Sequence, residues 1–242
     1  MKFGLQMYTV RDACETEKDF LHTLRAVKEQ GYDGVELAGY HDVPAKELKA
    51  VLEELGLTVL ASHESVERLE HELEEVLEYN HAIGNQNIVC AYSPASSTEE
   101  LEKLHNVLMN AEKSAQKYGM HILYHNHSHE FNLVDGKRPI DCIKEYCMLE
   151  LDTYWVFNSK VDVCDYIKAN ASRIGLIHLK DGGLDSNPCA IGEGKNDIHG
   201  IINTAKEAGF EWLIVENDNP TPDGLSDTAR SIHHLKTKYN AF

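Results

Sequence analysis

The stretch His121-Ile122-Leu123-Tyr124-His125 is one of four short apolar runs in this sequence that each end on a residue able to bind a metal ion. The other three are Met148–Asp152 (MLELD), Ile174–His178 (IGLIH) and Trp212–Glu216 (WLIVE). Runs of about five residues rich in Val, Ile, Leu and Tyr are typical of buried parallel strands. All strands of a closed parallel barrel end at the same rim, so two imidazoles and two carboxylates are expected to meet there.

The rest of the chain alternates strand and helix patterns in the same way. The pattern predicts four further strands, at Lys2–Tyr8, Gly34–Ala38, Thr58–Ser62 and Asn87–Ala91. Stretches with one apolar face predict the helices Phe20–Gln30, Lys46–Leu55, Ser65–His81, Thr98–Tyr118, Pro139–Tyr146, Asp162–Asn170, Ile198–Ala208 and Leu225–Tyr239. Eight βα units favour an α/β fold, a single (β/α)8 TIM barrel over residues 1–242.

The composition excludes several classes of function. The chain of 242 residues has a formal net charge of -17, which disfavours binding to nucleic acid or to acidic membranes through the whole surface. The opening Met1–Leu5 reads as a strand rather than a signal peptide, and we find no apolar run long enough to cross a membrane. The six cysteines show no CxxC spacing, so we expect a reduced, cytoplasmic protein without disulfides.

The ends of the four apolar runs supply the candidate metal ligands His125, Asp152, His178 and Glu216. Mixed nitrogen and oxygen donors suit a divalent ion such as manganese, zinc, cobalt or iron. The alternative is a set of polar loop residues that happen to follow strands. Glu150 lies two residues before Asp152, so it is expected to enter the barrel interior and to need a partner there.

Other polar residues near the predicted rim are candidates for contacts with substrate or for proton transfer. The segment that follows His125 holds His127 and Glu130, either of which is a candidate to move protons. Lys180 alternates onto the side of His178 and is expected either to reach a substrate oxygen or phosphate or to be an exposed loop lysine. The candidates for contacts with a hydroxylated ligand are Gln6, Tyr8, Glu36 and His63. The loop Gly192–Gly194 alone is weak support for phosphate binding, because it lacks a GxGxxG or Walker A pattern.

At these residues the chain resembles the sugar phosphate isomerase/epimerase superfamily, the xylose isomerase-like TIM barrels. The resemblance covers essentially the whole chain and is specific for the superfamily rather than for one reaction. The matching pieces are Gly4–Arg11 (GLQMYTVR), Gly31–Ala38 (GYDGVELA), Tyr124–Phe131 (YHNHSHEF), Leu151–Val156 (LDTYWV), Ile177–Asp181 (IHLKD), Gly192–Gly194 with Asp197 (GEGKND) and Ile214–Asn219 (IVENDN).

The resemblance implies one divalent metal, often manganese, held after strands five to eight, which by position gives His125, Asp152, His178 and Glu216. In the sugar 3-epimerases of the family, the ligand of strand five is a glutamate that pairs with the glutamate of strand eight in acid–base catalysis. His125 stands at the matching position here, which puts that two-glutamate relay in doubt.

We therefore expect a metal-dependent isomerase or epimerase that acts on a small sugar, keto-sugar or sugar phosphate through an enediolate, with Glu216 as ligand and base. A lyase or dehydratase on a keto-sugar or inosose-like substrate is the first alternative, because it needs the same metal and base. A non-catalytic sugar-binding barrel is the third reading. The superfamily's three-zinc apurinic endonucleases rank lower, because this chain offers fewer ligands and is acidic. A small carbohydrate is the expected partner, with homo-oligomer formation left open.

Overall fold

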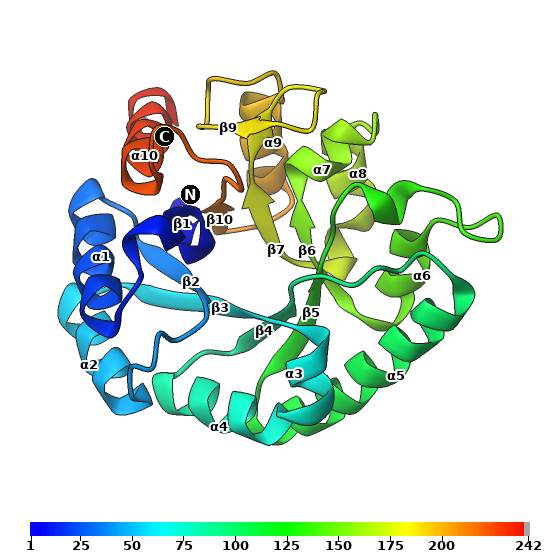
Figure 1. The fold of residues 1–242 in the computed structure, drawn as a ribbon. Coiled ribbons are helices and arrows are strands. Elements are labelled where there is room, and N and C mark those ends of the chain that lie inside the picture. The colour runs from blue at the N-terminus through cyan, green and yellow to red at the C-terminus, as the bar shows by residue number, and fades with distance from the viewer. Residues whose placement is uncertain (240–242) are drawn as a thin grey trace.

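The computed structural model describes residues 1–239, and the last three residues of the predicted 1–242 domain lie outside the described part. Eight parallel strands close a barrel in the order β1-β10-β7-β6-β5-β4-β3-β2, and helices surround it (Figure 1). The barrel strands are β1 (Lys2–Gln6), β2 (Gly34–Ala38), β3 (Thr58–Glu64), β4 (Asn87–Cys90), β5 (His121–His125), β6 (Met148–Asp152), β7 (Ile174–Leu179) and β10 (Trp212–Val215). The predicted TIM barrel is confirmed.

The outer layer is built from amphipathic helices whose ends are capped. The α-helices are α1 (Glu17–Gln30), α2 (Ala45–Leu55), α3 (Val66–His71), α4 (Leu73–Ile83), α5 (Thr98–Ala115), α6 (Pro139–Tyr146), α7 (Thr153–Asn158), α8 (Val163–Asn170), α9 (Ile198–Glu207) and α10 (Gly224–Tyr239). Ser97 caps α5 by accepting a hydrogen bond from the backbone N–H of Glu100, as its sequence predicts. Gly31 ends α1 with a φ of 101°, a left-handed conformation that favours glycine.

Several strand and helix ends differ from the predicted ones by up to three residues, and three differences are larger or change the type of element. The predicted helix 65–81 is two helices, α3 and α4, which meet at Glu72, where the backbone leaves the helical region. The first strand ends at Gln6 rather than Tyr8 and passes directly into the 3-10 helix η1 (Met7–Ala13). Helix α7 was not predicted, because its β-branched and aromatic residues (TYWVFN) have low helix propensity.

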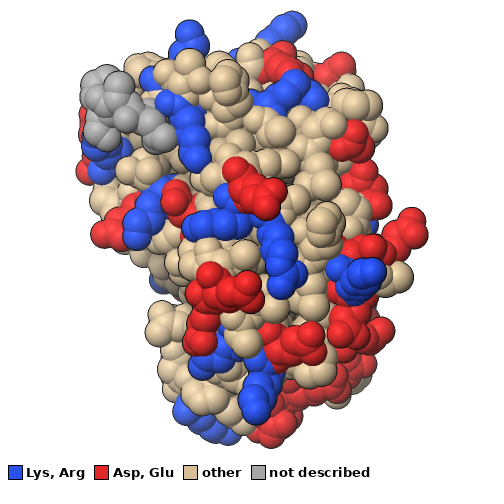
Figure 2. Space-filling model, turned by 90° about the vertical axis from the view of Figure 1, so that its left-hand side faces the viewer, with Lys and Arg blue, Asp and Glu red and all other residues tan. Residues whose placement is uncertain are grey.

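The remaining short elements decorate the ends of the barrel. They are the antiparallel pair β8 (Asp181–Gly182) and β9 (Pro188–Cys189) and the 3-10 turns η2 (Gln116–Tyr118), η3 (His129–Phe131) and η4 (Ala171–Arg173). None of the helices within residues 1–239 is long and apolar enough to span a membrane. On the face of the molecule turned to the viewer in Figure 2, acidic and basic side chains are interspersed.

The barrel interior has an apolar layer and, closer to the C-terminal ends of the strands, a polar layer. Ala61, Val89 and Leu123 are buried against one another, with Met148 and Leu176 packed on them. His63, His125, Glu150 and His178 each stand two residues beyond a residue of this apolar layer, namely Ala61, Leu123, Met148 and Leu176. Side chains two residues apart on a strand face the same side, so these four also point into the barrel. The apolar layer therefore supports a layer of imidazoles and carboxylates closer to the C-terminal ends of the strands.

Candidate metal centre and its pocket

The four predicted ligands converge. His125 ends β5, Asp152 ends β6, His178 lies in β7 and Glu216 directly follows β10. One ligand atom from each side chain lies within 4.8 Å of the corresponding atoms of the other three. All four residues are buried, with at most 4% of their surface exposed. Two imidazoles and two carboxylates held this closely form a donor set that suits a divalent transition ion.

Asp152 is fixed by the junction between a strand and a helix. It is the last residue of β6 and the N-cap of α7, and its Oδ1 accepts hydrogen bonds from the backbone N–H groups of Tyr154 (2.8 Å) and Trp155 (3.0 Å). Its Oδ2 instead faces the cluster, 3.8 Å from His125 Nε2. One oxygen is therefore structural, and the other is free to contact a cation.

Each of the two histidines in the cluster turns one ring nitrogen toward the cluster and the other toward a carboxylate below it. His178 places Nδ1 3.0 Å from Glu216 Oε2, and Nε2 2.5 Å from Glu36 Oε2 and 3.1 Å from Glu150 Oε2. His125 places Nδ1 3.0 Å from Glu150 Oε2 and Nε2 toward Asp152. Carboxylates that accept the second N–H of a histidine fix its tautomer and ring orientation for metal binding.

Glu150 is the partner of three imidazoles, because His63 Nε2 also lies 2.6 Å from its Oε2. Burial alone would raise the pKa of Glu150, but the adjacent His178 and His63 hold it well below the ordinary value. For Glu36, burial and the neighbouring Glu150 carboxylate raise the pKa to about 7. The other carboxylate oxygens, Glu36 Oε1 and Glu150 Oε1, are buried without a hydrogen-bond partner. Each carboxylate therefore keeps one buried oxygen without a hydrogen-bond partner, which points to a bound group at this position.

Lys180 lies within the cluster rather than on an exposed loop. The residue is fully buried, and its Nζ lies 3.2 Å from Asp152 Oδ2 and 3.0 Å from Glu216 Oε2 and also contacts Asp218. Burial opposes its charge, yet the three carboxylates raise its pKa above the ordinary value, so the side chain is an ammonium ion. Trp155 covers it, with the ring centroid 5.1 Å from Nζ.

A pocket of about 430 Å³ opens above this cluster, and we call it the mouth. Its lining residues are Tyr8, Ala38, His63, Ala91, Tyr92, His125, His127, Glu216 and Asp218. The cavity is within the size range of small-molecule sites. Two of the candidate ligands, His125 and Glu216, are among its lining residues.

The structure separates the other predicted site residues into two groups. Tyr8, His63 and His127 line the mouth. Glu36 and Gln6 are fully buried and do not line it. Glu36 contacts His178 as described, and Gln6 Oε1 accepts the backbone N–H of Tyr8 (3.0 Å), which caps η1.

The two candidates for proton transfer after β5 also differ. Glu130 is fully buried, and its two oxygens accept hydrogen bonds from Tyr124 OH (2.7 Å) and from the backbone N–H of His127 (2.8 Å). His127 lines the mouth, and its Nδ1 is buried without a partner. Burial, followed by the charges of His125 and Lys180, lowers the pKa of His127 to about 2, so its imidazole is neutral.

The glycine loop after β9 is closed by a side chain that sequence reasoning missed. Asp181 Oδ2 accepts the backbone N–H groups of Gly192 (2.9 Å) and Gly194 (3.1 Å), and Oδ1 accepts those of Gly182 (2.8 Å) and Asn196 (3.1 Å). A Cβ at Gly194 would overlap the Asp181 carboxylate. The sequence signal for this role was the short spacing between Asp181 and a glycine-rich turn. The amides of that turn bind the carboxylate of Asp181 rather than an anion from solution.

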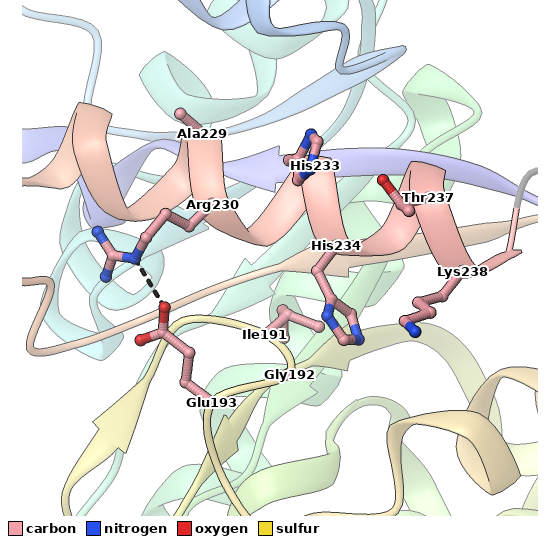
Figure 3. Close-up of a pocket in the computed structure, with 9 residues that line it drawn as sticks. All are labelled: Ile191, Gly192, Glu193, Ala229, Arg230, His233, His234, Thr237 and Lys238. Carbon is pink, nitrogen blue, oxygen red and sulfur yellow. Dashed lines mark hydrogen bonds and ion pairs between the residues drawn. The ribbon is translucent and has the colours of Figure 1, made fainter.

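A larger cavity, of about 650 Å³, lies elsewhere, between α10 and the loop Ile191–Glu193 (Figure 3). Arg230 Nε donates to Glu193 Oε1 across it (2.7 Å), and His233 and His234 come from the same helix. It shares no lining residue with the mouth. We therefore place the candidate site at the mouth, where the convergent ligands lie, rather than in the larger cavity.

Comparisons with known proteins agree with this fold. The family model described as xylose isomerase-like TIM barrel matches residues 24–238. No curated protein sequence matches the chain. A sugar phosphate isomerase/epimerase from Parabacteroides distasonis superposes with a TM-score of 0.84 at 20% identity, over 98% of this chain and 94% of that one.

Two further solved structures are similar in fold. A probable 3-DHS dehydratase, AsbF, from Bacillus anthracis gives a TM-score of 0.79 at 14% identity, over 99% of this chain and 100% of that one. The IOLI protein with a bound zinc atom gives a TM-score of 0.80 at 17% identity, over 100% of this chain and 99% of that one.

Proposed function

Because the chain belongs to the xylose isomerase-like TIM barrel family, we propose that it is a divalent-metal-dependent isomerase or epimerase. Its substrate is a small sugar, keto-sugar or sugar phosphate, and its reaction passes through an enediolate. The observation that carries the proposal is the convergence of four buried ligand side chains, within 4.8 Å of one another, beneath a pocket of about 430 Å³.

His125, Asp152, His178 and Glu216 would hold the ion, with Glu150 and Glu36 orienting the two imidazoles from below. We propose manganese, with zinc, cobalt or iron as the other ions that this donor set accepts. When bound there, a divalent ion polarises a carbonyl group and stabilises negative charge on the neighbouring oxygen.

The side chains of the chain itself would move and hold the protons. Glu216 lines the mouth, so its carboxylate is the group that we expect to take the proton from the carbon next to the carbonyl. Neutral His127 lines the mouth and would form a hydrogen bond with a substrate hydroxyl. Lys180 would hold Asp152 and Glu216 in place without touching the substrate, because it does not line the mouth, and Tyr8 and His63 would contact substrate hydroxyls.

A lyase or dehydratase is the second candidate, and one observation favours it. The mouth has no second glutamate among its described lining residues, because His125 stands at the end of β5 and Glu130 is turned inward. An epimerase that uses two glutamates removes a proton with one and returns it with the other, and this mouth lacks the second. A lyase that eliminates water or an alkoxide needs only one base. Mass spectrometry of the products separates the two, since only an isomerase conserves the mass of its substrate.

The test is a solvent-exchange measurement with Glu216→Gln. Manganese-loaded protein is incubated in D2O with a panel of ketoses and ketose phosphates, and deuterium incorporation is followed by NMR. We expect the variant to lose about 10³-fold in exchange rate with an unchanged circular dichroism spectrum, because loss of a general base costs roughly 10² to 10⁴. Glu211→Gln is the control, because Glu211 is exposed and directly precedes β10, the strand that Glu216 follows.

Normal exchange in Glu216→Gln would refute the assignment of the base. A third reading, a non-catalytic sugar-binding barrel, predicts that purified protein holds no metal and does not bind added manganese. Elemental analysis and a manganese titration therefore test the metal centre independently of any turnover.

A further inference from the structure

We infer that the sugar which this chain processes is uncharged and carries a ring substituent that occupies a second pocket beside the mouth. The inference rests on the proposed function and narrows its substrate class from sugars and sugar phosphates to neutral glycosides that carry a carbonyl group elsewhere on the reacting ring. Two independent features carry it, namely a pair of adjoining pockets and the charges around them.

The second pocket, of about 490 Å³, adjoins the mouth. The two share His63, Ala91 and Tyr92 as lining residues, and the second pocket extends between the segment after β3 and the segment after β4. Each volume is within the range of small-molecule sites, so together they exceed what one monosaccharide needs. A substrate with two rings would place the reacting ring above the metal ligands and the other ring in the second pocket.

The surface between the pockets suits an uncharged ring. Tyr92 belongs to both pockets and is 53% exposed, which is unusual for a large aromatic residue at the end of a buried strand. Val66, Pro94 and Leu104 add apolar walls to the second pocket. Aromatic and aliphatic walls bury the apolar faces of a sugar ring or of an aromatic aglycone.

The charges around the two pockets oppose a phosphate. The carboxyl groups that line them are Glu64, Glu67, Glu100, Glu216 and Asp218. The single lysine among the described lining residues, Lys103, already pairs with Glu70, with Nζ and Oε2 2.9 Å apart. A phosphate dianion in this negative field would need an unpaired cationic side chain, which the described lining does not offer, because His63 also pairs with Glu150.

The other groups that could bind a phosphate near the mouth are already used. Lys180 contacts three carboxylates, and the amides of the glycine loop donate to Asp181. Arg11 donates to the backbone oxygens of Tyr8 (2.7 Å) and Asp218 (2.9 Å), and its guanidinium stacks 4.0 Å above the Tyr8 ring. The protein therefore supplies its own hydrogen-bond acceptor to each of these groups that would otherwise recognise a phosphate.

Calorimetric binding to the manganese-loaded full chain tests this inference without turnover. The probes are D-glucose, D-galactose and D-mannose, each as the free sugar, the 6-phosphate, the methyl glycoside and the phenyl glycoside. Val66→Phe narrows the second pocket without touching the mouth, since Val66 lines only the second pocket. Val134→Phe is the matched control, because Val134 is similarly half-buried and lines a different pocket.

We expect at least one phenyl glycoside to bind about tenfold more tightly than its methyl glycoside, from burial of the added ring. Val66→Phe should abolish that difference and leave methyl glycoside binding unchanged, and Val134→Phe should preserve it. The inference is overturned if no phenyl glycoside outbinds its free sugar, or if any 6-phosphate binds more tightly than its parent sugar. Failure of the proposed function is a different result, namely loss of metal binding or of solvent exchange with this binding preference intact.

Discussion

Asp152 and Asp181 are both buried aspartates at the same rim, and they are held in opposite ways. All four hydrogen bonds to Asp181 come from backbone N–H groups, two on each oxygen. Asp152 gives one oxygen to the backbone and turns the other toward Lys180 and His125. A carboxylate saturated by the backbone builds structure, whereas one with an oxygen that faces only side chains can contact a bound ion.

The largest effect that we predict is on stability, from Asp181→Asn. An amide can accept on one side only, so two buried backbone N–H groups lose their acceptors, at roughly 1–3 kcal/mol each. We expect the free energy of unfolding in urea to fall by about 4 kcal/mol, with manganese affinity of the folded protein unchanged. If stability does not change, Asp181 is not the anchor of the glycine loop.

The reciprocal change, Asp152→Asn, should act on the metal centre. An amide oxygen can keep the hydrogen bonds to Tyr154 and Trp155 while an NH2 group replaces the oxygen that faces the cluster. We expect manganese affinity to fall by at least roughly 100-fold, because loss of a ligand costs more than the 10- to 100-fold that loss of an outer-shell partner costs. The free energy of unfolding without metal should fall by about 1–3 kcal/mol, because the new NH2 group faces the Lys180 ammonium and cannot accept its hydrogen bond.

Asp162→Asn is the matched control for that change, because Asp162 caps α8 through its side chain but lies outside the cluster. Its manganese affinity, measured by the same titration, should equal that of the unchanged protein. Equal losses in both variants would mean that the cap of a helix, and not the oxygen facing the cluster, controls binding.

Lys180→Met should raise manganese affinity, by a smaller factor than Asp152→Asn lowers it. The ammonium contacts the same Asp152 Oδ2 and Glu216 Oε2 that face the cluster, so it competes with a metal ion for them. We expect manganese affinity to rise about tenfold, since one nearby positive charge is removed. The metal-induced rise in melting temperature should grow as well, and Lys103→Met should leave both unchanged. Weaker manganese binding in Lys180→Met would show that the ammonium supports the ion instead of competing with it.

The sequence predicted the elements whose side-chain pattern is unambiguous. Strands β2, β5 and β6 have the predicted bounds, because short apolar runs between turn residues allow one reading. Their shared rim then follows from barrel geometry, and it also yields the convergence of His125, Asp152, His178 and Glu216.

What the sequence did not reveal depends on side-chain partners far apart in the chain. Glu36 was expected at the substrate, but it lies two residues before the end of β2, as Glu150 does in β6, and both face the interior layer. The contact of Lys180 with three carboxylates also could not be read from its own segment. Helix α7 was hidden, because tertiary packing overrides the strand preference of its residues.

The two halves of the barrel contribute different things. The four candidate ligands come from β5 and the strands after it, whereas most of the lining shared by the two pockets comes from β3 and β4 and the segments that follow them. Evolution could therefore exchange one half for a homologous half and acquire a new substrate, while the chemistry in the other half stayed in place. Chimeric barrels joined between Gly119 and His121 would be a practical way to engineer such a change.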